Sequence, residues 1–76
     1  MGIQIDFSKK LKDALELFKL NASLYPSSAN TYDSLGETYA ELEEFEPAIK
    51  NYEKALQLNP QNKNAEEIIK KLRSKL

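Results

Sequence analysis

Two helix-like stretches with matching small and aromatic positions constrain this chain more than any other feature. Tyr32, Leu35, Gly36 and Tyr39 recur at the spacing of one helix face. Ala48, Tyr52 and Ala55 share one face of a second predicted helix, and Pro60 follows that helix. Glycine inside a helix costs about 1 kcal/mol relative to alanine, so Gly36 needs a packing reason. We predict that Gly36 and Ala48 let the two helices approach closely, with the tyrosines filling the space beside them.

This spacing resembles the tetratricopeptide repeat, a helix–turn–helix unit of about 34 residues. The resemblance covers residues 29–62, and tyrosine stands at position 32 where tryptophan is commoner in the family. It implies an all-α fold built as a helix–turn–helix repeat array, a fragment of an α-solenoid. The structural signature positions are Tyr32, Leu35, Gly36, Tyr39, Ala48, Tyr52, Ala55 and Pro60.

The sequence partly repeats itself when it is shifted by one unit. Ala14, Phe18, Leu24 and Pro26 align with Ala48, Tyr52, Leu58 and Pro60. We therefore expect a half repeat over 8–24, the full repeat over 29–62 and a capping helix over 63–75, which make four antiparallel helices in a single domain, 1–76. Gly2 would align with Gly36, so we expect the chain to begin partway along the first helix of the earlier unit.

The turn after the first helix of the full repeat departs from the family pattern. The family usually has glycine where Glu43 stands, because the residue takes a left-handed conformation there. Two outcomes are open, a closed hairpin with a strained turn or one continuous rod. Pro47 opposes the rod, because its ring would clash with the carbonyl of Glu43 in a continuous helix. We predict the closed hairpin.

Composition argues against catalysis and against bound cofactors. The 76 residues contain no cysteine and no histidine, which removes the thiol nucleophile, the commonest general base and the commonest metal ligands. We predict no enzymatic activity, no catalytic residues, no cofactor and no metal site, and we interpret Glu43, Glu44 and Glu46 as a solvated acidic turn. No apolar run approaches about 18 residues, so no membrane interaction is expected. The localisation stays open, with the cytoplasm favoured.

The charges are segregated along the chain although they nearly cancel. Residues 29–46 hold six acids and no base, whereas residues 63–76 hold five bases, and the net charge is −1. This balance argues against nucleic-acid binding, which requires a basic face. In the resembled family, successive first helices line a concave groove that binds a peptide or a partner helix. That resemblance places the following residues on the groove: Asn30, Asp33, Ser34, Glu37, Ala40, Glu41, Asn64, Glu67 and Lys71.

Two readings of this surface follow. In the first, the chain is a protein–protein interaction module, and charge complementarity favours a basic or neutral peptide over an acidic one. In the second, the face is merely solvated and the chain has a structural role, as a homodimer or packed against a parent protein. A second, weaker resemblance supports that role. The run from Phe18 to Glu37 resembles repeat segments that trail bacterial serine hydrolases.

Overall fold

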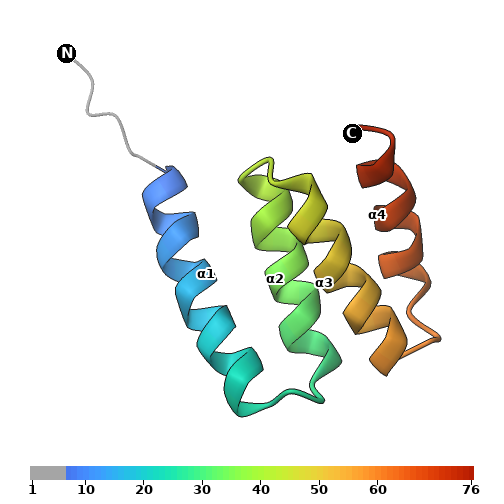
Figure 1. Ribbon diagram of the computed structural model, residues 1–76, viewed down its shortest axis with the longest axis horizontal. Helices are drawn as coiled ribbons and strands as arrows, with labels where there is room; N and C mark the ends of the chain where they lie inside the picture. The colour runs from blue at the N-terminus through green and yellow to red at the C-terminus, as the bar shows by residue number, and fades with distance from the viewer. Residues whose placement is uncertain (1–6) are drawn as a thin grey trace.

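In the computed structural model, residues 7–76 form four α-helices that lie in a row, each antiparallel to the one before it (Figure 1). The helices are α1 (Phe7–Leu24), α2 (Ala29–Glu41), α3 (Phe45–Leu58) and α4 (Lys63–Arg73). The predicted all-α repeat architecture is therefore confirmed. Residues 1–6 are not described, so the expectation that Gly2 belongs to an earlier helix lies outside the described residues.

The helices α2 and α3 pack in close contact where the sequence places its small residues. Ala48 has no exposed surface, and Tyr52 is 5% exposed against Gly36. A Cβ atom on Gly36 would lie 2.6 Å from Tyr52 Cδ2 and 2.9 Å from Tyr52 Cγ. These distances are shorter than van der Waals contact, so the aromatic ring occupies the space that any side chain at position 36 would need. The predicted nesting of the two helices is confirmed.

The turn between α2 and α3 closes the hairpin as predicted. Glu43 has φ 61°, the left-handed conformation that glycine usually provides. The Glu43 N–H donates to the Ala40 carbonyl at 3.0 Å and the Glu44 N–H donates to the Tyr39 carbonyl at 2.9 Å, which together form a Schellman motif. A non-glycine residue in this conformation costs about 1–2 kcal/mol, and the paired carbonyls help to offset that cost.

The last helix packs on α3 through a narrow apolar stripe. Ala65, Ile69 and Leu72 are buried in the same cluster as Ala48, Ile49 and Tyr52. Asn62 caps this helix as the sequence predicted, because its side-chain oxygen accepts a hydrogen bond from the Ala65 N–H at 3.1 Å. Leu76 does not join the core, since 68% of its surface is exposed.

Candidate functional site

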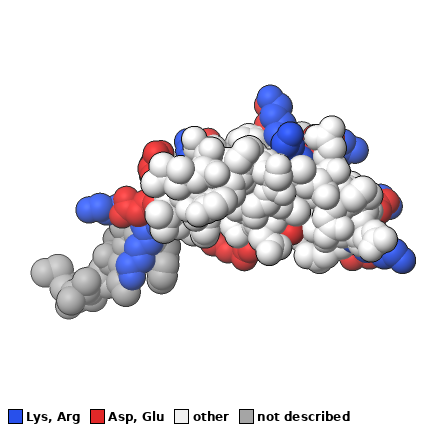
Figure 2. Space-filling view, turned by 90° about the horizontal axis from the view of Figure 1, so that it is seen from below, with Lys and Arg blue, Asp and Glu red and all other residues white. Residues whose placement is uncertain are grey.

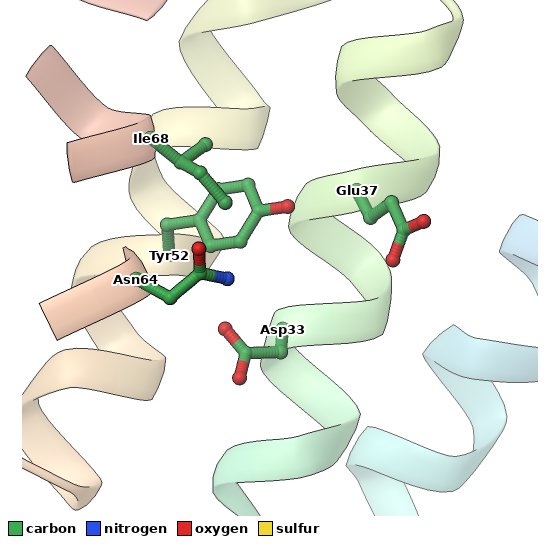
Figure 3. Close-up of a pocket in the computed structure, with 5 residues that line it drawn as sticks. All are labelled: Asp33, Glu37, Tyr52, Asn64 and Ile68. Carbon is green, nitrogen blue, oxygen red and sulfur yellow. The ribbon is translucent and has the colours of Figure 1, made fainter. Parts of the chain in front are cut away.

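A groove lies between α2 and α4 in the described chain, with α3 as its floor (Figure 3). Its volume is about 390 Å³. Charged and polar groups line it beside an apolar wall, so it presents both kinds of surface to a ligand. The lining residues are Asp33 and Glu37 from α2, Tyr52 from α3, and Asn64 and Ile68 from α4.

Helical periodicity explains how these side chains come together. Asp33 and Glu37 lie four residues apart on α2, and Asn64 and Ile68 lie four residues apart on α4, so each pair occupies one helix face. A hydrogen bond from Asn62 Nδ2 to Asp33 Oδ2, 3.0 Å long, ties the start of α4 to the middle of α2. The distance between the two walls of the groove is therefore held by a polar contact as well as by the core.

Acidic side chains surround the groove, and their negative charge contributes to the raised pKa of the Tyr52 hydroxyl. Burial raises the pKa of the Tyr52 hydroxyl to about 12, and the carboxylates of Glu37, Asp33 and Glu41 add to that shift. Desolvation and nearby negative charge both disfavour the phenolate. The hydroxyl therefore stays protonated throughout the physiological pH range, where it can both donate and accept a hydrogen bond.

The structure brings together only some of the residues that the repeat resemblance placed on the groove. Asp33, Glu37 and Asn64 line the hollow. The other predicted residues do not line it. These are Asn30, Ser34, Ala40, Glu41, Glu67 and Lys71. Most of them lie beyond its ends, whereas Ser34 and Glu67 lie within its span but on another face of their helices. Their part in binding stays a prediction.

Sequence reasoning missed two lining residues, Tyr52 and Ile68, because it assigned both to the core. Each has an apolar part in the core and an edge that opens into the groove. One signal was available for Tyr52. The aligned residue of the preceding half repeat is Phe18, so only the later unit carries a hydroxyl at this position.

A second, smaller hollow of about 220 Å³ lies between α3 and α4. Its charged side chains include Glu53 and Arg73, which form an ion pair of 3.1 Å across the two helices. These charges already satisfy each other. The groove between α2 and α4 is therefore the better candidate for a polar ligand.

An apolar surface on α1 is the second candidate for contact with another molecule. Leu17, Leu20 and Leu24 are each more than half exposed, and Tyr25 beyond the helix is 64% exposed. Figure 2 looks onto the end of the molecule where α1 joins α2, and the surface there is largely uncharged, with the charged side chains towards the rim. Exposed apolar patches of this kind mark contact surfaces in soluble proteins.

Other kinds of site are not found in the part of the chain that the structure describes. Within residues 7–76, acidic side chains form no group of three or more placed to hold a metal ion. None of the four helices combines the length and apolar character needed to span a membrane.

The packed helix pair and its groove define the class of molecule, a helical-repeat protein. Residues 29–62 match the family model described as tetratricopeptide repeat, so the chain carries a repeat of this family. Repeats of this family are generally protein–protein interaction modules and typically act as non-catalytic scaffolds. No curated protein matches the chain. The resemblance to the tails of bacterial serine hydrolases stays a prediction.

Proposed function

We propose that the chain is a non-catalytic interaction module that binds a basic or neutral peptide, or a partner helix, in the groove between α2 and α4. The observation that carries this proposal is the acidic groove itself. Asp33 and Glu37 line it without a basic residue among the lining side chains. A cationic partner gains favourable Coulomb energy at such a surface, whereas an acidic peptide is repelled. No nucleic acid and no membrane is proposed as a partner.

A peptide array tests this proposal directly. We expect the full chain to bind peptides rich in lysine or arginine more tightly than neutral ones and to bind acidic peptides weakest. Reversing one groove charge with Glu37→Lys should weaken the binding of basic peptides by about tenfold or more, because it converts attraction into repulsion. Binding is read by fluorescence anisotropy with labelled peptides at low and at physiological salt.

The matched control is Glu46→Lys, which makes the same charge change at an exposed position in the first turn of α3, away from the lining residues. Its effect on affinity should be small and should vanish at physiological salt. A preference for acidic peptides would refute the charge argument. An absence of binding to any peptide would refute the proposed function.

A second candidate function, self-association, is favoured by the apolar surface of α1. Ala14 and Phe18 are only half buried, whereas the aligned Ala48 and Tyr52 are 0% and 5% exposed. The difference arises because α3 is covered by both α2 and α4, whereas α1 packs against α2. With the exposed leucines beside them, these residues leave one side of α1 apolar and uncovered.

The charge pattern of α1 favours a second copy in the antiparallel orientation. Its first half carries Lys9, Lys10 and Lys12, whereas residues 20–32 carry no charge. A parallel pair would place the lysines against each other, and an antiparallel pair places them against the uncharged half of the partner. Two copies related in this way would cover the leucine stripe Leu17, Leu20 and Leu24 symmetrically.

Sedimentation velocity at several concentrations measures this directly. We expect a monomer–dimer equilibrium that shifts towards the monomer in Leu20→Lys, because the substitution places a charge within the apolar contact. Leu76→Lys, at a position that is 68% exposed and outside the stripe, should leave the equilibrium unchanged. A monomer at every concentration would contradict self-association. It would favour a different protein as the molecule that covers the apolar surface of α1.

A further inference from the structure

We infer that the groove between α2 and α4 holds one lysine or arginine side chain of the bound partner, with its charged head between Asp33, Glu37 and the Tyr52 hydroxyl. The inference rests on the proposed peptide-binding function and adds the chemical group that the groove selects. It stands on two independent observations. One is the pair of carboxylates, and the other is the hydroxyl of the largely buried Tyr52, which opens into the groove and has no hydrogen-bond partner within the described chain.

The Tyr52 hydroxyl has no hydrogen-bond partner among residues 7–76, although the side chain is 95% buried. The hydroxyl oxygen itself reaches solvent, because no buried side-chain nitrogen or oxygen of the described residues lacks a hydrogen-bond partner. The hydroxyl is not sealed inside the core, because Tyr52 lines the groove and its oxygen points towards α2 (Figure 3). A group that enters the groove is therefore placed to complete its hydrogen bonding.

The acceptors around the groove outnumber the donors. Asp33 uses one carboxylate oxygen for the bond from Asn62, and its other oxygen has no partner in the described chain. The Glu37 carboxylate is exposed and forms no ion pair or hydrogen bond within residues 7–76. Together with the Tyr52 oxygen, these groups offer three acceptors to one ligand. A cation that carries several N–H donors matches this set better than a neutral or anionic group.

The apolar wall adds a requirement for the stem of that cation. Ile68 and the ring of Tyr52 lie on the same side of α2 as the Asp33 carboxylate (Figure 3), and Glu37 also lines the hollow. Lysine and arginine bury their methylene stems along apolar surface while the charged head reaches polar groups. A volume of about 390 Å³ accommodates such a side chain together with the adjoining main chain. A metal ion would not use this wall, and a short ammonium group would leave it uncovered.

The functional variant is Tyr52→Phe, which removes the hydroxyl and keeps the ring. Because that hydroxyl makes no hydrogen bond within the described chain, its removal should leave folding intact. We expect the affinity for a lysine- or arginine-containing peptide to fall about tenfold, the loss typical of a hydrogen bond to a charged group. Tyr32→Phe is the matched control, since Tyr32 does not line the groove. This variant should bind the same peptide with the affinity of the wild type.

The charge variant is Glu37→Gln rather than Asp33→Asn, because Asp33 also holds the start of α4 through Asn62. We expect Glu37→Gln to weaken binding severalfold and to reduce its dependence on salt. Glu46→Gln is the control for the loss of one acid at an exposed position. Replacing the single lysine or arginine of a bound peptide by norleucine should cost about as much as Tyr52→Phe and Glu37→Gln combined.

A titration with small probes separates this inference from the function on which it rests. The probes are N-acetyl-lysine N-methylamide, the arginine equivalent, and the norleucine equivalent as the uncharged control. We expect the two cationic probes to shift the NMR signals of Asp33, Glu37, Asn64 and the Tyr52 ring, and norleucine to leave them unchanged. If the cationic probes bind in the groove but no peptide binds, the proposed peptide-binding function is refuted. The inferred binding site for a lysine or arginine side chain would still stand.

Three results would overturn the inference. One is peptide binding that is insensitive to Tyr52→Phe and Glu37→Gln, which would mean that water alone satisfies the hydroxyl. Another is a norleucine probe that shifts the NMR signals as much as the cationic probes do, which would mean that the groove binds only the apolar part of the side chain. The last is a response to the cationic probes at residues outside the groove.

Discussion

Replacing Gly36 by alanine is expected to lower the free energy of unfolding by about 1–3 kcal/mol, the usual cost of overpacking a core. Helix propensity predicts the opposite, because alanine stabilises a helix interior by about 1 kcal/mol relative to glycine. Packing wins because the new Cβ would lie 2.6–2.9 Å from ring carbons of Tyr52. That ring is buried beside Ala48 and Ile69, so it has little room to move. Urea denaturation followed by circular dichroism measures the change.

A double-mutant cycle identifies the cause. In the Tyr52→Leu background the ring is gone, so Gly36→Ala should become neutral or should stabilise by up to about 1 kcal/mol. The sign of the Gly36→Ala effect therefore reverses with the identity of its neighbour. If alanine destabilises equally in both backgrounds, contact with the Tyr52 ring is not the reason for glycine at this position.

The residues that the sequence predicted well are those whose role depends on local spacing. Gly36, Ala48 and Glu43 act through contacts and backbone angles that a repeat of fixed length places in the same way each time. Glu43 shows the limit of a family pattern, since it takes the left-handed conformation without being glycine. The Schellman hydrogen bonds and the position of Pro47 in the first turn of α3 determine the turn, and the residue at position 43 adapts to it.

The groove was harder to predict because periodicity assigns a residue to a helix face but does not say where that face ends. Tyr52 and Ile68 lie at such an edge, with part of each side chain in the core and part in the groove. Exposed apolar surface on α1 was expected from the sequence, but its particular residues could not be assigned for a related reason. Leu17, Leu20 and Leu24 repeat with helical spacing just as the packed face does, and only the positions of the neighbouring helices show which stripe is covered.

Replacing Ile69 by alanine is expected to lower the free energy of unfolding by about 2–5 kcal/mol, the range for truncating a buried aliphatic side chain. Ile69 is 5% exposed and belongs to the cluster that joins α4 to α3. A chain of 76 residues has little stability to lose, so this change is large for the whole domain. Leu76→Ala, at the exposed end of the chain, should change stability by less than about 0.5 kcal/mol.

The same substitution should also weaken peptide binding, because α4 carries Asn64 and Ile68 on the groove wall. Since α4 packs mainly on α3, hydrogen exchange should show that it loses protection before α2 and α3 do. If Ile69→Ala leaves too little folded protein to measure, Ile69→Val should cost about 0.5–1.5 kcal/mol and remain measurable. Uniform loss of protection over all four helices would mean that α4 is not a separate cap and that the domain unfolds as one unit. Loss confined to α4, together with loss of binding, would show that the last helix contributes to the groove by staying docked on the repeat.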